Sequence, residues 1–567
     1  MTHTLHNFPA RLHPVALALA GLLLSGTTWA ATFVVTDAGD APDVVPGDGL
    51  CAHSGAACSL RAAIQEANTL GGAHTIHFAI ATGGPGVAAL IAPTTPLPAV
   101  RTPITIDGYT QPGSSANTAA VGNNAVINVR IDGKNIGVSA SGLVFYPGSS
   151  NSALRGVAIT GFNTHGVFLL GDTGPVGSST NGVTIAGNFI GTDGSGAGDD
   201  TNGLLANGMS GIRIANYAHE NIVGGATSAD RNLIITSSSG AGISIDGVYN
   251  TQIRNNYIGT DRSGSSRRNT LVGVDIAGPY TIISNNVVGA LGTGISIHGG
   301  GVGLVMQGNL IGVGTTGTSI ADAASSHGIY IRSIDTTPLR NNHIGGTNTG
   351  EGNTIANWGG NGVHIERSST TAAQPRYQSI LGNSIHSNGG LGIELIDTAT
   401  GQGTQPGDAA PPTVNGGLRY PVITGVTSNA AGTLVSYGYS GAFNARYRIE
   451  VFSNAACDPS SYGEGQTFLG SADIMTGGVM YTGDVLLPAV PAGSHLTMTA
   501  TRDFNDADGS LETSEFSRCF EVPAGPGDGG PGNGGAVTPV PTLGHWGLVL
   551  LSALLGAMGL RARRHSR

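Results

Sequence analysis

The 567-residue chain is poor in charged, aromatic and basic side chains. Charged residues make up 11% of it, aromatic residues 5%, and Lys134 is its single lysine. With a formal net charge of −10, the chain lacks the basic surface that holds a phosphate backbone, so we exclude a nucleic-acid partner. A hydrophobic fraction of 40% excludes a disordered chain, while 93 glycines are too many for an ordinary α/β enzyme. The composition favours a fold built from thin turns and small side chains.

One short phrase recurs along the chain: a glycine, an apolar residue, any residue, and a second apolar residue. Its copies begin at Gly166, Gly211, Gly242, Gly273, Gly294, Gly328, Gly362 and Gly392. The steps between copies average about 32 residues, a spacing typical of repeat architectures. Alternation of period two indicates strands with one buried face, and each unit is too short to bury that face alone. We therefore predict an all-β solenoid, a parallel β-helix over residues 87–397 whose coils stack on one another.

A second phrase begins with asparagine and runs out of phase with the first. Its copies begin at Asn188, Asn256, Asn286, Asn309 and Asn342. We attribute these asparagines and the repeated glycines to tight turns with a left-handed backbone, where stacked amides can hydrogen-bond from coil to coil. The phrase resembles the asparagine ladders of the right-handed β-helix family, which includes pectate lyases and many bacterial surface proteins. The resemblance implies a right-handed coil.

Residues 1–30 have the three-part layout of a secretory signal peptide. Arg11 precedes an apolar run at 15–24, and small residues follow at 27–31. About ten apolar residues are too few to span a bilayer, and a buried N-terminal helix is the alternative interpretation. We predict that the protein is exported through the inner membrane and that the mature chain begins near Ala31.

Residues 31–86 are predicted to form an N-terminal cap that contains a short amphipathic helix over 60–68. Ser59 precedes this helix, and its apolar stripe would close the open end of the solenoid. The stripe consists of Leu60, Ala63, Ile64 and Ala67. The run starting at Cys58 resembles the CSLREA motif of secreted bacterial β-helix proteins, although Ala62 stands where that motif has glutamate.

The four cysteines are predicted to form two disulfides in an oxidising compartment. Cys51 and Cys58 are neighbours in the cap, and Cys457 and Cys519 lie in the C-terminal part of the chain. A metal or catalytic thiol role for the first pair is the alternative. No zinc-type spacing of histidine and cysteine surrounds that pair, which favours the disulfide.

Three further segments follow from composition and periodicity. The polar stretch 111–124, between the first irregular coils, is predicted to be a loop standing off the solenoid. Residues 398–419, rich in glycine, proline and threonine, are predicted to be a linker. Residues 420–522 show alternating strands separated by turn residues, which predicts a small Ig-like β-sandwich after the solenoid.

An acidic turn in this last module has two interpretations. When Gly509 is aligned with the sixth position of an EF-hand loop, Asp506, Asp508 and Glu515 fall on ligand positions, but Phe504 occupies the first. A solvated acidic turn and a weak calcium site are therefore both open, and we expect no other cofactor.

The chain ends in a proline and glycine linker at 523–538 and an apolar segment at 539–567. The sequence Val-Pro-Thr-Leu opens this segment at Val540, and arginines follow the apolar run. It resembles the IPTL-type C-terminal sorting signal of Gram-negative bacteria, with Val540 in place of isoleucine. The resemblance implies a short transmembrane segment that anchors the chain transiently until a membrane-embedded sorting enzyme removes it. A permanent anchor is the alternative.

In the repeated glycine phrase, the residues between the apolar ones point outward, and stacking lines them up in columns. One column contains Arg213, Ser244, Asp275, Ser296, Tyr330, His364 and Glu394, and its neighbour contains Ala215, Asp246, Ala277, His298, Arg332, Glu366 and Ile396. We predict a ligand face from Tyr330, Arg332, His364, Glu366 and Glu394, able to bind a glycan. A simple surface ion pair between Arg332 and Glu366 is the alternative.

Local catalytic signatures are absent. No Arg-x-Lys pair exists, and the His-Gly steps at His165, His298 and His327 lack the preceding glycine and the partner aspartates of polygalacturonases. The adjacent carboxylates Asp199 and Asp200 lie in a glycine-rich insert. We therefore predict a non-catalytic, exported cell-surface protein with an adhesive, glycan-binding or matrix-structural role. The alternative is a polysaccharide lyase or glycoside hydrolase that uses Glu366, Glu394 and His364 for general acid and base catalysis.

Overall fold

The computed structural model of the protein describes residues 30–524, except 54, 85–86, 173–179, 197–204, 323, 404–412 and 479. The predicted signal peptide, the glycine-rich insert with Asp199 and Asp200, and the C-terminal segments at 525–538 and 539–567 therefore fall outside the described residues. Within the described residues, no helix is long and apolar enough to cross a membrane. The predicted transmembrane segment belongs to the part of the chain that is not described.

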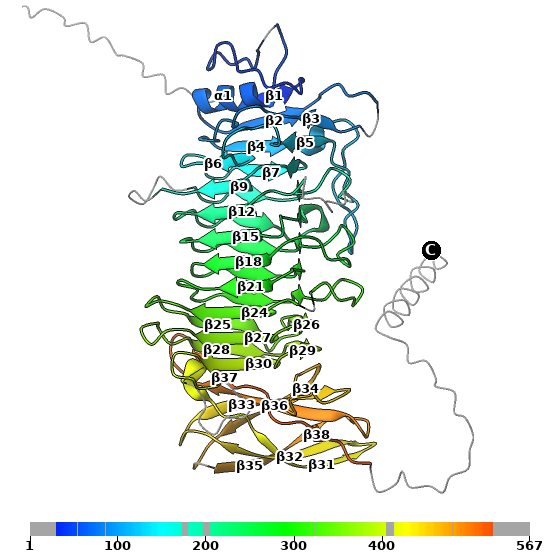
Figure 1. The fold of residues 1–567 in the computed structure, drawn as a ribbon, viewed down its shortest axis with the longest axis vertical. Helices are drawn as coiled ribbons and strands as arrows, with labels where there is room; N and C mark the ends of the chain where they lie inside the picture. The colour runs from blue at the N-terminus through cyan, green and yellow to red at the C-terminus, as the bar shows by residue number, and fades with distance from the viewer. Residues whose placement is uncertain are drawn as a thin grey trace, which may run out of the picture. The chain divides into compact units, whose positions relative to one another are not determined.

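The predicted right-handed parallel β-helix is confirmed, and its coils contribute strands to three parallel sheets (Figure 1). Sheet A contains β1 (Thr32–Val35), β2 (His74–Phe78), β4 (Ile104–Asp107), β7 (Ala153–Arg155), β10 (Thr184–Ile185), β13 (Ile222–Gly224), β16 (Gln252–Arg254), β19 (Ile282–Ser284), β22 (Val305–Gln307), β25 (Arg340–Gly345) and β28 (Arg376–Leu381). Sheet B contains β3 (Ala89–Ile91), β5 (Val129–Asp132), β8 (Ala158–Thr160), β11 (Phe189–Ile190), β14 (Leu233–Ile234), β17 (Tyr257–Ile258), β20 (Val287–Val288), β23 (Leu310–Ile311), β26 (Thr354–Ala356) and β29 (Ser384–His386). Sheet C contains β6 (Leu143–Phe145), β9 (His165–Leu170), β12 (Ser210–Ala215), β15 (Ala241–Asp246), β18 (Val272–Ala277), β21 (Thr293–Ile297), β24 (Ile329–Ser333), β27 (Val363–Arg367) and β30 (Ile393–Asp397).

The repeated glycine phrase forms the strands of sheet C, and its apolar positions fill the core. Ile243 and Ile245 on β15 pair with Val274 and Ile276 on β18, and all four side chains are buried. Burying a side chain of this kind contributes about 1.5–3 kcal/mol. Since each coil covers the apolar edge of the one before it, the core is continuous along the stack.

The repeated glycine itself has a different cause from the left-handed turn that we predicted. Gly242 lies inside β15 rather than in a turn. A Cβ atom there would lie 2.4 Å from the Ile258 side chain and 2.6 Å from the Gly273 carbonyl oxygen of the next coil. The glycine is therefore required by the close approach of neighbouring coils and not by backbone conformation.

The asparagine ladder is confirmed, with three additions and one correction. Buried amides are linked from coil to coil through Asn188, Asn232, Asn256, Asn286, Asn309, Asn353 and Asn383. In each link the asparagine Oδ1 accepts from the side-chain Nδ2 of the preceding member, and the Nδ2 groups also donate to backbone carbonyls such as Ile253 O. Asn342 is not part of this ladder, because it lies on β25 of sheet A and donates to Gln378.

The helix predicted near the N-terminus is present as α1 (Leu60–Leu70), and its N-cap Ser59 accepts from the Ala62 backbone N–H. Parallel pairing begins before the predicted boundary at residue 87, because β1 pairs with β2 and β2 pairs with β4. These two strands are short and are separated by α1, so the sequence shows no repeat there. The predicted disulfide between Cys51 and Cys58 is confirmed.

The stretch 111–124 does not stand off the solenoid as predicted. The Asn117 amide donates to the Ser228 carbonyl at 2.8 Å, and the Gly122 N–H donates to the Tyr257 hydroxyl at 2.9 Å. The Arg231 guanidinium donates to the carbonyls of Ala119, Ala120 and Gly122. The insert therefore packs along later coils through contacts between residues more than a hundred positions apart.

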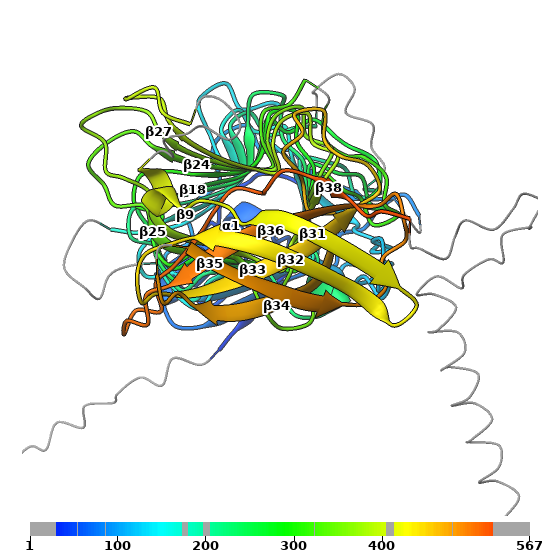
Figure 2. The same ribbon diagram turned by 90° about the horizontal axis from the view of Figure 1, so that it is seen from below.

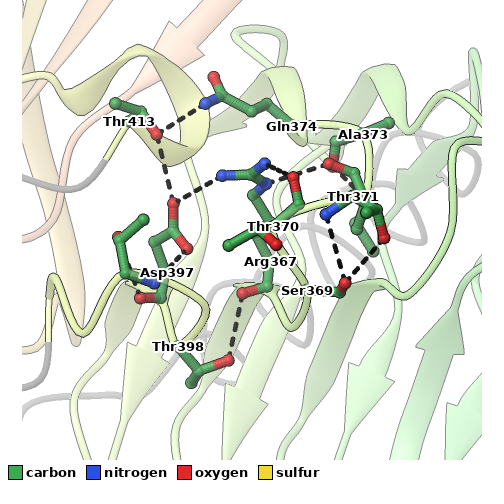
Figure 3. Close-up of polar contacts among 12 residues, drawn as sticks. Arg367, Ser369, Thr370, Thr371, Ala373, Gln374, Asp397, Thr398 and Thr413 are labelled. Carbon is green, nitrogen blue, oxygen red and sulfur yellow. Dashed lines mark hydrogen bonds and ion pairs between the residues drawn. The ribbon is translucent and has the colours of Figure 1, made fainter.

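The predicted linker at 398–419 is in part a packed segment (Figure 3). Asp397 is buried and pairs with the Arg367 guanidinium at 3.3 Å, and the Thr413 hydroxyl donates to the same carboxylate at 3.4 Å. The Thr398 hydroxyl donates to the Arg367 carbonyl at 3.1 Å. The ends of the stretch thus fold back on the last coil.

The predicted β-sandwich consists of two antiparallel sheets, which Figure 2 shows face on. The smaller sheet contains β31 (Val422–Asn429), β32 (Gly432–Ser440) and β35 (Met480–Leu487). The larger contains β33 (Arg446–Asn454), β34 (Thr467–Met475), β36 (His495–Asp503), β37 (Leu511–Thr513) and β38 (Phe520–Glu521). The predicted disulfide between Cys457 and Cys519 is confirmed.

Carboxylates of the sandwich accept hydrogen bonds from the last coil of the solenoid. A final rung has no further strand to accept from its backbone N–H groups. Glu464 accepts from the N–H groups of Ser387 at 2.5 Å and Asn388 at 2.9 Å, and Glu450 accepts from Gly382 at 3.0 Å. Glu512 and Glu515 do the same for Tyr377 and Leu395. The sandwich therefore closes the C-terminal end of the solenoid.

Replacing a central member of the asparagine ladder is expected to destabilise the solenoid. Asn286→Ala removes the acceptor for Asn256 and the donor to the Ile253 carbonyl, which should cost about 1–3 kcal/mol in the free energy of unfolding. Urea unfolding measures this change, with Gln252→Ala as the control, because the Gln252 amide on β16 makes no hydrogen bond within the described residues. Equal stability of the two variants would show that the ladder contributes nothing.

Removing one closing carboxylate is also expected to destabilise the protein. Glu464→Ala leaves the N–H groups of Ser387 and Asn388 and the Asn388 amide without their acceptor, at a cost of about 2 kcal/mol. Glu521→Ala, at an exposed glutamate of the same sandwich, should change stability by less than about 0.5 kcal/mol. A Glu464 variant as stable as the Glu521 variant would contradict the closing role.

Candidate functional site

The predicted outward columns of sheet C are confirmed by the strand register. Tyr330 on β24 lies opposite His364 on β27, and His364 lies opposite Glu394 on β30. Arg332 lies opposite Glu366 in the neighbouring column. The five residues of the predicted ligand face thus occupy three consecutive strands. We call this set, with His327 and Asn361 described below, the sheet C cluster.

Three rings pack together in the sheet C cluster. The rings of His327 and His364 are stacked with centroids 4.2 Å apart and planes 13° apart. The Tyr330 ring lies 5.3 Å from His364 and 5.1 Å from His327. Sequence analysis missed His327 as a member, because it directly precedes the repeated phrase and had been considered only as a His-Gly step. The available signal was its position just before the glycine phrase of β24, one coil before His364.

Both histidines are neutral with defined hydrogen positions. The Asn361 backbone N–H donates to His327 Nδ1 at 3.0 Å, and the Asn361 side-chain amide lies 2.7 Å from His364 Nδ1. Since an N–H can only donate, Nδ1 is the acceptor and the hydrogen of a neutral ring resides on Nε2. Burial lowers the pKa of His327 to about 4 and that of His364 to about 3. Each ring therefore offers an Nε2 donor at neutral pH.

Glu366 is held by three neighbours. It accepts a short hydrogen bond from the Tyr330 hydroxyl and one of 2.9 Å from the Thr398 hydroxyl, and Arg332 Nε lies 3.6 Å from it. Its side chain is 12% exposed, whereas that of Arg332 is 49% exposed. Burial, followed by the hydrogen bond to Glu366, raises the pKa of the Tyr330 hydroxyl. The predicted ion pair exists, but it is one part of a connected polar network.

These groups are better placed for binding than for proton transfer. A general base works best when its pKa lies near the working pH, and His364 lies far below neutrality. The Glu366 oxygens are already occupied by hydroxyl donors. The partly buried Glu394, on the next strand, is the remaining carboxylate of the cluster. Ring faces, fixed ring donors and an exposed arginine form a surface suited to a polar ligand.

The N-terminal half of the same face contains ordinary ion pairs. Arg213 pairs with Asp246 at 2.8 Å, and His298 lies 3.1 Å from Asp275, whose hydrogen bond raises the pKa of that histidine. These pairs are exposed in part and contribute little to stability. The stacked rings therefore distinguish the C-terminal half of the face.

The calcium candidates do not form a common site. Asp506 accepts from the Ser510 N–H at 2.9 Å within the exposed turn, and this bond lowers the pKa of its carboxyl group. Glu515 instead accepts from the Leu395 N–H at the end of the solenoid. The described residues contain no group of three or more histidines, cysteines or carboxylates that could hold a metal ion. Glu515 is thus one of the carboxylates that contact the last coil.

Comparison with known proteins supports the C-terminal signal and adds little on function. Residues 538–565 match the IPTL-CTERM motif, which fits an exported protein recognised by a membrane-associated sorting enzyme. No curated protein matches the chain. Among solved structures it is similar to the A-module of mannuronan C-5 epimerase from Azotobacter vinelandii, with 14% identity over 62% of this chain and 96% of that chain and a TM-score of 0.27. At this identity and score, the similarity carries no information about activity.

The buried histidines of the sheet C cluster are expected to make stability fall on acidification. An unfolded histidine protonates near pH 6.5, whereas His327 and His364 stay neutral in the folded chain to about pH 4 and about pH 3. Between these values the unfolded state binds more protons, so the free energy of unfolding declines as the pH falls below about 6.5. Urea unfolding at about pH 7.5 and about pH 5 measures the decline.

The variant His327→Asn/His364→Asn keeps an oxygen near each Nδ1 position and removes both titrating rings, so its decline should be shallower than that of the parent. Ser296→Ala, in the same column, is the control without a titrating group. A decline as steep in the double variant as in the control would contradict this assignment.

Proposed function

We propose that the protein is an exported, cell-surface β-helix protein that binds glycans through the sheet C cluster without acting on them chemically. The observation that carries this proposal is the fixed state of Glu366, which is held by Tyr330, Thr398 and Arg332. A carboxylate held in this way positions the tyrosine ring, and its oxygens already accept from two hydroxyl groups.

Export is supported by two independent features. The IPTL-CTERM motif lies at residues 538–565, and both disulfides belong to an oxidising compartment. We propose that the chain crosses the inner membrane behind the signal peptide at 1–30 and is anchored transiently at its C-terminal end. A membrane-embedded sorting enzyme then releases the protein for display on the cell surface or for secretion. Outside the cell, binding of a glycan would give the protein an adhesive or matrix role.

The chemistry of the cluster suits a sugar. A pyranose ring presents C–H groups on its faces, which pack against aromatic rings, and hydroxyl groups at its edge. The stacked rings of His327 and His364 with Tyr330 provide such a platform. The ring Nε2 donors and the exposed Arg332 guanidinium provide hydrogen bonds at its edge.

Removal of the Tyr330 ring is expected to weaken glycan binding. A glycan array with the purified protein identifies the best ligand, and titration of that ligand then compares variants. Tyr330→Ala should raise the Kd about two- to tenfold, because a ring contact of this kind is worth about 0.5–1.5 kcal/mol. Ser296→Ala, in the same column on β21, should bind as the parent does.

Two results would overturn the proposal. Equal affinity of Tyr330→Ala and Ser296→Ala would exclude the sheet C cluster as the binding face. Cleavage of an acidic or neutral polysaccharide by the parent, lost in Glu366→Gln/Glu394→Gln, would instead establish the hydrolase or lyase alternative.

A further inference from the structure

A polar cavity of about 510 Å³ lies between sheet A and the insert, formed by residues distinct from the sheet C cluster. Its wall consists of Thr118 and Ala120 from the insert, Gly225, Ala226, Ser228 and Arg231 from the turn after β13, Arg254 and Asn255 at the end of β16, and Ser284 and Asn285 at the end of β19. The volume is within the range of small-molecule sites. The cavity lies where the insert packs against later coils.

Arg254 gives this cavity an uncompensated positive charge. Its Nε atom is buried and has no hydrogen-bond partner within the described residues, and the guanidinium forms no ion pair there. In the register of sheet A its neighbours are Gly224 and Ser284, which bring no charge. A buried guanidinium donor without an acceptor is costly, so an anionic ligand at this position would be stabilised.

A second guanidinium in the same wall is also without a carboxylate. Arg231 is 5% exposed, donates to carbonyls of the insert and to Asn255 Oδ1, and lies 4.6 Å from the centroid of the Tyr257 ring. The one carboxylate on the lining turn, Asp230, accepts from the Thr227 N–H and hydroxyl. The wall therefore contains two positive charges and no negative one.

The uncharged polar side chains of the wall indicate which other groups the anionic ligand has. Ser228, Ser284 and Thr118 bring hydroxyls, and Asn255 and Asn285 bring amides. No aromatic or large aliphatic side chain lines the wall. Such a wall matches a ligand that is rich in hydroxyl groups and has little apolar area.

We propose that this cavity binds an acidic sugar, with its negatively charged group on Arg254 and its hydroxyls on the serine, threonine and asparagine side chains. The site is separate from the sheet C cluster and does not depend on the function proposed for it. Carboxylate and sulfate groups both accept hydrogen bonds from a guanidinium as anions. Carboxylated and sulfated sugars are therefore both used as probes of the site.

Isothermal titration of the purified full chain tests the site with glucuronate, glucose 6-sulfate, glucose and inorganic sulfate. We expect one or both sugar acids to bind and glucose to bind at least about tenfold more weakly, because charge-assisted hydrogen bonds are about twice as strong as neutral ones. Loss of glucuronate binding below about pH 3 would identify the carboxylate as the bound group, whereas the sulfated sugar keeps its charge there.

Matched variants locate the bound charge. Arg254→Gln should weaken the acid by about tenfold or more, and Arg340→Gln, an exposed arginine of the same sheet, should leave it unchanged. Ser284→Leu fills the cavity and should also abolish binding. Equal affinity of Arg254→Gln and Arg340→Gln would overturn the proposal, as would sulfate binding as tightly as the sugar acids or glucose binding equally well. Binding that Arg254→Gln and Ser284→Leu remove belongs to this cavity, which separates a failure here from a failure of the sheet C cluster.

Discussion

A parallel β-helix depends on one constraint: every coil needs another coil, or a substitute for one, on each side. Within the stack the next coil supplies both the apolar cover and the hydrogen-bond partners, as Ile243 and Val274 illustrate. At the two ends no further coil exists, and exposed strand edges invite aggregation. The segment with α1, between β1 and β2, and the sandwich that follows β30 therefore serve largely to close the stack.

The two ends are closed by different means. At the N-terminal end, α1 buries Leu60 and Ile64 against the first coil, and the Arg61 guanidinium pairs with Asp40 and donates to the Thr95 carbonyl. The buried Glu66 accepts from the N–H of Gly49 at 2.5 Å. At the C-terminal end the sandwich presents Glu450 and its companions to the last rung. At the C-terminal end glutamate oxygens replace the carbonyls of a missing strand, and at the N-terminal end Glu66 holds the loop before α1, which explains carboxylates at buried positions of a charge-poor chain.

The regular part of the fold was predictable, since a column is a direct consequence of a repeated phrase. Once the glycine phrase is aligned, the opposition of Tyr330 and His364 follows without further information. Asn342 was misassigned because its sequence, Asn-His-Ile-Gly, resembles the ladder phrase while its strand belongs to another sheet. The packed insert was not predictable, because Arg231 is held by backbone carbonyls that no side-chain pattern reveals. Nor does the sequence show why glycine recurs, which requires the distance between coils.

Regularity also indicates where function resides. A side chain that serves only the stack recurs from coil to coil, as the ladder asparagines do, so a group that occurs once needs another explanation. The stacked pair of His327 and His364 occurs once on sheet C, and the unpartnered Arg254 occurs once on sheet A. Both lie on the outer surface of the coils, whereas the inner surface of the same coils is packed with apolar side chains as elsewhere in the solenoid. Side chains that point inward thus hold the coils together. Side chains that point outward and differ from the repeat can bind a ligand.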